Sequence, residues 1–315
     1  MIISDIIGCT GAVIFFLLVS VWVPFIGPLF ILLIPLPFLY YLSKSGFGQG
    51  WKTGLISLLI LSLIARLIGY PYLILFCILL GLVGLIISET FKRGFTIGMT
   101  IFWGTVLMLF TGALSLFLIS LSTGTGAIQL IVGYLQTNVD RAIGLYEEMG
   151  LDQQTMIQLK QFGALLNNLI AQIYPALIII AAGFIIWINV VISRPLFRLR
   201  GVKYPDLGRA DMWYAPEFMV WGVIAAGFSL FFPATGIKFI ALNSLIVLIV
   251  IYVFHGVAIT MFFFNKYNIP PWARFGVYFL IMIQQIFLFV LALAGLFDQW
   301  IDFRKIHKKR LEETQ

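Results

Sequence analysis

Long apolar runs dominate the pattern of hydrophobic and polar positions along the chain. Nine of them lie at about 6–23, 24–43, 52–68, 71–89, 95–120, 168–193, 214–232, 236–264 and 275–297. The runs are continuous, and many reach the length of about 18 residues at which an α-helix can cross a bilayer. Strands of a membrane β-barrel would instead alternate apolar and polar positions. The pattern therefore predicts an all-α protein, a polytopic bundle of transmembrane helices.

A polar stretch at about 121–166 interrupts these runs. Apolar residues recur in it at spacings of three and four: Ile143, Tyr146 and Met149, then Met156, Leu159 and Phe162. This spacing predicts a helical hairpin of amphipathic helices, the second capped by Asp152 and continuous with the sixth apolar run. The simpler alternative is a solvated hairpin that only joins two spans.

The composition indicates that lipid is the surrounding solvent. Hydrophobic residues make up 61% of the 315 positions and charged residues only 10%, against about 25% charged residues in a soluble domain. The formal charge of +7 is typical of loops that contact anionic headgroups and does not indicate nucleic-acid binding. Cys9 and Cys77 lie in apolar context and predict neither a metal site nor a disulfide framework. We expect membrane lipids as partners, no nucleic acid, no cofactor and no metal.

Basic residues gather in loops on one side of the predicted membrane. Lys44 and Lys52 flank the loop after the second run, and Lys92 and Arg93 follow the fourth. The largest group follows the sixth run and comprises Arg194, Arg198, Arg200, Lys203 and Arg209. By the positive-inside rule these loops are cytoplasmic and the stretch 121–166 is extracytoplasmic. The first run has no preceding Lys or Arg, so we interpret it as a retained span rather than a signal peptide.

The C-terminal tail breaks this parity. It contains Arg304, Lys305, Lys308, Lys309 and Arg310. It should therefore be cytoplasmic too, whereas three further crossings would place it outside. We predict that the run at 214–232, which has Asp211 and Glu217 near its start, re-enters the membrane or lies in the interface. Eight spans with both termini in the cytoplasm follow, and nine spans with a violated charge rule is the alternative.

Few ionisable or amide side chains lie inside the runs. His255 lies in the eighth run, and Gln284 and Gln285 lie near the middle of the ninth. If these two helices pack antiparallel, the three residues share a depth and form the best candidate for a ligand site. Asn243 is a further candidate, but twelve residues of helix separate it from His255 by about 18 Å. The alternative is interhelical hydrogen bonding, which contributes about 0.6 kcal/mol on average.

The end of the ninth run combines acidic and basic residues. Asp298, Asp302 and Lys305 fall on one face of a continuing helix. Asp302 can pair with Lys305, whereas the tail bases lie too far along the helix to serve Asp298. We therefore predict that Asp298 pairs across to a base or a backbone donor of another segment. The candidate bases are Arg194, Arg198 and Arg200. The simpler interpretation is an anchored helix end without such an ion-pair lock.

Motifs of soluble enzymes are absent from the sequence. It contains no Gly-x-Ser-x-Gly, no Cys-x-x-Cys and no His-x-x-x-His. The stretch GFGQG at 46–50 lacks the Lys-Ser/Thr of a phosphate loop and is predicted to be a turn. We expect a protein that is not an enzyme.

Three stretches resemble a known family. GLFDQWIDFRK at 295–305, the Pro-rich segment with its glycine-rich turn at 26–54, and the long run at 241–267 are similar to the YybS-like family of uncharacterised bacterial inner-membrane proteins. The N-terminal half also resembles substrate-binding components of energy-coupling-factor vitamin transporters and the cell-shape protein MreD. These resemblances imply an inner-membrane location and supply no catalytic residues.

Four segments follow from the pattern and the resemblance. They are a five-span bundle at 1–120, the extracytoplasmic helical segment at 121–166, the C-terminal spans at 167–297 and a basic cytoplasmic tail at 298–315. The first hypothesis is a small-solute binding or transport component that needs partner subunits, because the chain has no nucleotide-binding motif. The alternative is a non-transporting, MreD-like scaffold that recruits membrane or cytoplasmic proteins of the envelope or of division.

Overall fold

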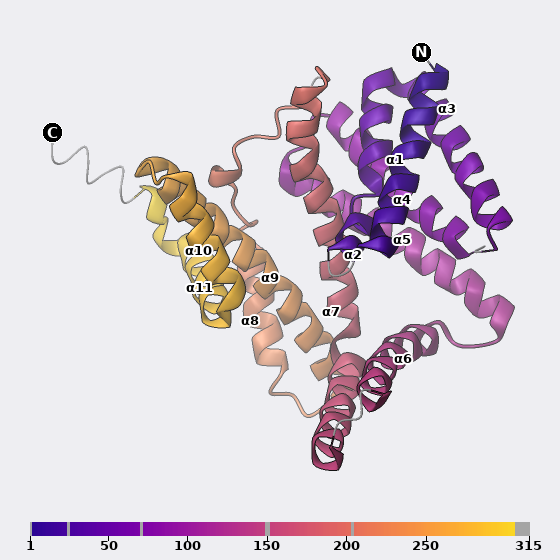
Figure 1. The fold of residues 1–315 in the computed structure, drawn as a ribbon. Helices are drawn as coiled ribbons and strands as arrows, with labels where there is room; N and C mark the ends of the chain where they lie inside the picture. The colour runs from indigo at the N-terminus through magenta and orange to yellow at the C-terminus, as the bar shows by residue number, and fades with distance from the viewer. Residues whose placement is uncertain (1, 24–25, 70–71, 149–151, 203–204, 306–315) are drawn as a thin grey trace, which may run out of the picture. The chain divides into compact units, whose positions relative to one another are not determined.

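The computed structural model describes residues 2–23, 26–69, 72–148, 152–202 and 205–305 (Figure 1). Within these ranges all regular structure is helical and there is no strand, which confirms the all-α class. The predicted tail bases Lys308, Lys309 and Arg310 lie outside the described residues, as does Lys203. The helices are α1 Ile2–Trp22, α2 Gly27–Ile31, α3 Pro35–Leu67, α4 Tyr72–Lys92, α5 Ile97–Thr123, α6 Ala127–Glu148, α7 Gln153–Leu199, the 3₁₀ helix η1 Ala210–Met212, α8 Met219–Ser229, α9 Thr235–Lys266, α10 Pro271–Ile283 and α11 Gln285–Ile301.

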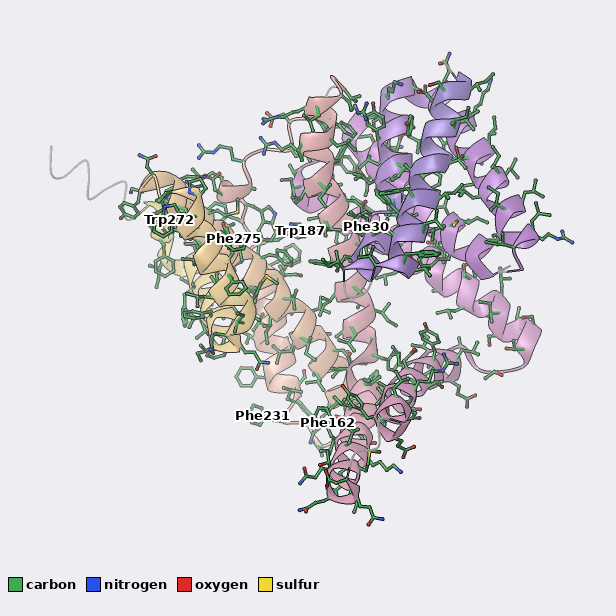
Figure 2. All side chains as sticks on the ribbon, in the orientation of Figure 1. Phe30, Phe162, Trp187, Phe231, Trp272 and Phe275 are labelled. Atoms are coloured by element: carbon green, nitrogen blue, oxygen red, sulfur yellow. The ribbon has the colours of Figure 1, made fainter. Side chains whose placement is uncertain are left out.

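In the described part of the chain, seven helical stretches are long and apolar enough to cross a membrane, or eight if α10 and α11 count as one bent span. Two of the seven lie within or next to α3 and are divided at Gly46. Its φ of 72° and ψ of 178° are readily accessible only to glycine, so the glycine-rich stretch is a turn, as predicted. Large apolar side chains such as Phe231, Trp272 and Phe275 are exposed (Figure 2), as expected where lipid is the solvent.

The chain divides into two compact units. The first contains residues 1–119 and 181–207, and the second contains 120–180 and 208–315. In the first unit α3 packs against α1 and α4. Its core contains Val13, Phe38, Leu61, Ile87 and Ile186, all almost fully buried.

The second unit begins with the predicted helical hairpin of α6 and the first part of α7. The Asp152 carboxylate accepts hydrogen bonds from the Thr155 amide at 3.0 Å and the Thr155 hydroxyl at 2.6 Å, which confirms the predicted cap. These bonds lower the pKa of Asp152. The two helices are joined by an ion pair of Lys160 with Glu147 at 2.6 Å.

The segment that precedes α9 lies along almost the whole length of that helix. Asp211 accepts a hydrogen bond from the Asn265 amide at 3.0 Å near the end of α9, and Gly222 packs against Leu248 near its middle. Thr235 then begins α9 at the other end. The helix of this segment, α8, is too short to count among the membrane-spanning helices, so its predicted re-entry or interfacial position stays a prediction. The short helix of this segment is preceded by non-helical residues at 213–216. Because an extended chain covers about 3.3 Å per residue against 1.5 Å in a helix, the segment follows the length of α9 with few helical residues.

The ninth apolar run is broken rather than straight. The helix directions of α10 and α11 differ by 104° across Gln284, whose ψ of 105° leaves the helical region. At the start of α10, Arg274 donates a hydrogen bond to the Asn265 side chain at 2.8 Å. After α11, Arg304 donates to the carbonyl oxygen of Asp211 at 3.1 Å. Because Asp211 itself bonds Asn265, both arms meet the same end of α9, and the pair forms a bent hairpin (Figure 1).

Candidate functional site

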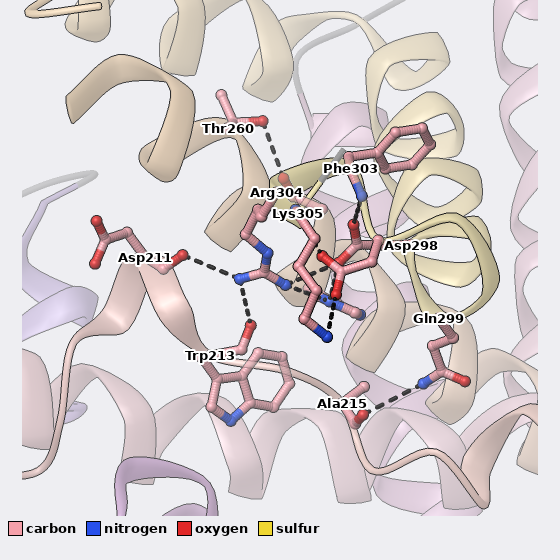
Figure 3. A network of polar contacts seen from close by, with 12 residues as sticks. Asp211, Trp213, Ala215, Thr260, Asp298, Gln299, Phe303, Arg304 and Lys305 are labelled. Atoms are coloured by element: carbon pink, nitrogen blue, oxygen red, sulfur yellow. Dashed lines mark hydrogen bonds and ion pairs between the residues drawn. The ribbon is translucent and has the colours of Figure 1, made fainter. Parts of the chain in front are cut away.

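Three charged or titratable side chains form a buried cluster in the second unit, here called the triad. His255 on α9, Asp298 on α11 and Arg304 after α11 are 0%, 1% and 5% exposed. Arg304 Nη2 donates to Asp298 Oδ2 at 2.8 Å, and His255 Nε2 lies 3.1 Å from the same oxygen (Figure 3). Arg304 Nη2 also lies 2.9 Å from His255 Nε2. A cation, an anion and an imidazole therefore meet at one point.

A chain reversal brings Arg304 to Asp298. Helix α11 ends at Asp302, which adopts the left-handed conformation with φ 46° and ψ 70°, one that aspartate tolerates better than most residues. The next amide, that of Phe303, donates to Asp298 Oδ1 at 2.8 Å. The prediction that the tail bases lie too far along to serve Asp298 was wrong, because it assumed a continuing helix. Asp302 itself pairs with Lys305 at 2.8 Å.

The three arginines proposed as partners of Asp298 belong to the other unit. Arg194, Arg198 and Arg200 are exposed side chains at the end of α7, within residues 181–207. The carboxylate of Asp298 already binds Arg304 and the Phe303 amide through its two oxygens. Asp298 thus has an ion-pair partner within its own unit, which the predicted lock with the 194–209 loop did not include.

The Arg304 guanidinium is held on several sides. Its Nη1 donates to the carbonyl oxygens of Asp211 at 3.1 Å and Trp213 at 3.2 Å. Its Cζ lies 3.5 Å from the centre of the Tyr214 ring, which is a cation–π arrangement. Its Nε is buried and has no hydrogen-bond partner in the described protein. Arg304 thus retains one donor that the rest of the described protein does not use.

His255 completes the triad between aromatic rings. The centres of the Trp213 and Tyr214 rings lie 6.0 Å and 5.5 Å from its own. A protonated Nε2 donates to Asp298, whereas an unprotonated Nε2 accepts from Arg304 and leaves the proton on Nδ1. Nδ1 is buried without a partner among the described residues. The cluster can therefore hold the imidazole proton at either nitrogen.

Two glycines allow α9 and α11 to approach closely. A Cβ added to Gly256 would collide with the backbone of Leu291, and one added to Gly295 would collide with the Tyr252 carbonyl oxygen. Small residues permit this backbone-to-backbone packing in membrane helices. Sequence reasoning missed both glycines, although the small residues could have indicated a helix contact.

The other predicted ligand residues lie elsewhere. Gln284 and Gln285 are exposed at the hairpin break, and Gln285 precedes Asp298 by thirteen helical residues, or about 20 Å. The structure therefore does not bring the glutamines to His255. Asn243 bonds the Ala176 amide at 2.9 Å and the Gln172 carbonyl oxygen at 2.8 Å, and so joins α9 to α7. This is the interhelical hydrogen bonding that was the alternative to a ligand site.

A cavity of about 430 Å³ adjoins the triad, and we call it the cationic pocket. Half of its lining residues are basic and none is acidic. The lining residues are Arg209, Met212, Tyr214, Phe262, Asn265, Lys266, Arg304 and Lys305. Arg209 binds both carboxylate oxygens of Asp211, at 3.1 Å and 2.7 Å, which lowers the pKa of Asp211. Lys266 has no carboxylate partner in the described part of the chain.

A family model described as "Predicted membrane protein (DUF2232)" matches residues 11–299. The chain belongs to this family. The match covers both units, including α11 as far as Gln299, and its description agrees with the helices that are apolar enough to span a membrane. No curated protein and no solved structure matches the chain.

This DUF2232 chain contains another ion pair with a buried acid and an exposed base, which sequence reasoning missed. Asp5, near the start of α1 in the first unit, is 3% exposed. It accepts hydrogen bonds from Lys44 at 2.6 Å and from the Ser45 hydroxyl at 3.2 Å. An acidic residue at the start of an apolar run was the available signal. No group of three potential metal ligands occurs among the described residues.

Proposed function

We propose that the protein is a small-solute binding component of a membrane transport system, with its site at the triad and the cationic pocket. The observation that carries the proposal is the burial of Asp298, Arg304 and His255 in or next to membrane-spanning helices. Charged side chains buried among such helices are costly, and they commonly mark substrate or proton pathways.

The energetic argument favours a functional role over a structural one. A buried ion pair is often no more stabilising than well-packed apolar residues of the same volume, because desolvation offsets the attraction. Helix α9 and helix α11 already pack closely through Gly256 and Gly295. A helix contact of this kind does not need a charged cluster for its stability.

The broken helix pair supports the same proposal. Discontinuous helices in membrane proteins usually line a cavity or a ligand site, because their freed backbone groups need polar partners. Here both arms of the α10–α11 hairpin are attached near Asn265 through Arg274 and Arg304. The attachment leaves the break at Gln284 as the part that can move in a transport cycle.

The proposed topology places both termini in the cytoplasm. In place of the predicted re-entry of the seventh run, we propose that the segment leading into α9 crosses beside α9 and that the α10–α11 hairpin re-enters, so that two crossings follow six in the rest of the chain. The tail then lies on the same side as the basic loop at 194–209, in accord with the charge rule. The location we propose is the bacterial inner membrane, on the basis of the resemblance to the YybS-like proteins.

Partner subunits would supply the energy for active transport, because the sequence has no nucleotide-binding motif. The resemblance of the N-terminal half to binding components of vitamin transporters favours such an arrangement. The resemblance to MreD favours the alternative, a scaffold without a ligand. Fold-level similarity does not decide between these functions.

Native mass spectrometry of the gently purified protein tests the proposal. We expect a small molecule to be retained by the wild type and lost from Arg304→Lys, which keeps the charge but removes the planar fork. Lys160→Gln, which removes an exposed ion pair on the α6–α7 hairpin, is the matched control and should retain it. A wild-type protein that binds only other proteins and no small molecule would refute transport and favour the scaffold.

A further inference from the structure

We infer that the cationic pocket binds a phosphate group, carried either by an anionic lipid or by a soluble phosphate ester. The inference deepens the proposed function, because it names the ligand class of the same site. It rests on the composition of the pocket wall, the unused donors there and the apolar side chains beside them.

The pocket wall presents positive charge without a matching negative wall. Arg209, Lys305 and Arg304 are each bound by one carboxylate, those of Asp211, Asp302 and Asp298 respectively. None of these carboxylates lines the pocket. Lys266 lines it as well, with no carboxylate partner among the described residues. An anion in the pocket would therefore bind to basic side chains that already line it.

Unused hydrogen-bond donors indicate where such an anion would bind. Lys266 has three N–H donors and no carboxylate partner among the described residues. The Arg209 and Lys305 side chains are 67% and 83% exposed, so both can turn toward a ligand. A phosphate has three or more acceptor oxygens and can bind several such donors at once, whereas a carboxylate has only two.

The remaining wall suits an organic group attached to the phosphate. Met212, Tyr214 and Phe262 present apolar surface beside the cations. The pocket lies at the C-terminal end of α9, which ends at Lys266 after a long apolar helix. Basic pockets at the end of membrane helices are the usual binding sites of anionic lipid headgroups. A volume of about 430 Å³ also falls within the range of small-molecule sites.

The test uses the full-length protein in nanodiscs of phosphatidylcholine, with and without phosphatidic acid. Native mass spectrometry measures the retained lipid, and thermal unfolding measures the effect of added glycerol 3-phosphate and inorganic phosphate. The variant is Lys266→Gln, and the matched control is Lys238→Gln, an exposed lysine in the first turn of the same helix α9. Loss of one charge-assisted hydrogen bond should weaken binding about tenfold.

The inference is supported, with a lipid as the source, if the wild type and Lys238→Gln retain phosphatidic acid and Lys266→Gln retains about tenfold less. Stabilisation by glycerol 3-phosphate or inorganic phosphate, with the same dependence on Lys266, supports it with a soluble source. Equal losses in both variants would mean nonspecific attraction and would overturn it. So would the absence of binding to every probe.

The outcomes also separate this inference from the proposed function. A retained solute without phosphate, bound equally by the wild type and by Lys266→Gln, would overturn the inference and leave the transport proposal standing. Phosphate binding that depends on Lys266, in a protein that retains no transportable solute, would leave the inference standing and count against transport.

Discussion

Replacing Asp298 by asparagine tests whether the triad holds the second unit together. The Asp298 carboxylate accepts one bond from Arg304 and one from the Phe303 amide, and His255 contacts it. Asparagine has nearly the same shape and can still accept a hydrogen bond from the amide. The change therefore removes the negative charge and leaves Arg304, which is 5% exposed, without an anionic partner.

The expected cost is large, because a buried charge is left uncompensated. Removing one member of a buried ion pair typically costs about 3–5 kcal/mol. The Arg304 guanidinium keeps its bonds to two backbone carbonyl oxygens and its contact with Tyr214. We therefore expect a loss at the lower end, about 3 kcal/mol of unfolding free energy.

Equilibrium unfolding by SDS in mixed micelles, followed by circular dichroism, measures this loss. Asp302→Asn is the matched control, because Asp302 pairs with a Lys305 side chain that is 83% exposed, and asparagine also tolerates the left-handed conformation there. Its stability should stay near that of the wild type. The double variant Asp298→Asn with Arg304→Gln contains no unpaired charge at this point and should be less destabilised than the two single effects add up to.

Equal stability of Asp298→Asn and Asp302→Asn would refute this reasoning. It would mean that water or lipid headgroups reach Arg304 and replace the carboxylate without cost. A double variant whose loss equals the sum of the single losses would likewise show that Asp298 and Arg304 do not interact energetically.

Three further predictions concern other parts of the second unit. Gly256→Ala should lose about 1–3 kcal/mol in the same unfolding assay, because a Cβ there meets backbone, whereas Gly227→Ala, with nothing within 4 Å of its Cβ, should be neutral or slightly stabilising. The bonds of Asp211 to arginine and asparagine lower its pKa. The ionised carboxylate therefore stabilises the fold above the ordinary aspartate pKa of about 4, and this stabilisation is lost as the pH falls further. In Asp211→Asn the stability should depend less on pH in this acidic range. A membrane-impermeant maleimide added to intact cells should label Phe232→Cys and not Tyr267→Cys, because the two positions flank α9 at its opposite ends, and labelling of both would contradict the crossing of α9.

The sequence alone was sufficient for the features that depend on neighbouring residues. Continuous apolar runs predicted an all-α membrane protein, and the Asp152 cap and the turn at Gly46 were visible from residue type and spacing. Each depends on local backbone preference or on the transfer of apolar side chains out of water, and both are properties of a short stretch of chain.

The broken ninth run could not be predicted from its sequence. The stretch IMIQQIFLF around Gln284 and Gln285 has no proline or glycine to mark a break. Its apolar pattern suits one straight helix as well as two short ones. Hydropathy likewise does not reveal that residues 213–216, before the helix of the seventh run, are non-helical and cover distance more quickly than a helix does.

Only the tertiary structure decided which charges meet. His255 and Asp298 are 43 positions apart, and Asp298 meets Arg304 because the chain reverses at Asp302. Sequence spacing placed Asp298 correctly among groups that need a partner, but the partner depends on the path of the backbone. Long-range electrostatic contacts are set by how helices pack and where they end, and a one-dimensional pattern of residue types does not contain that information.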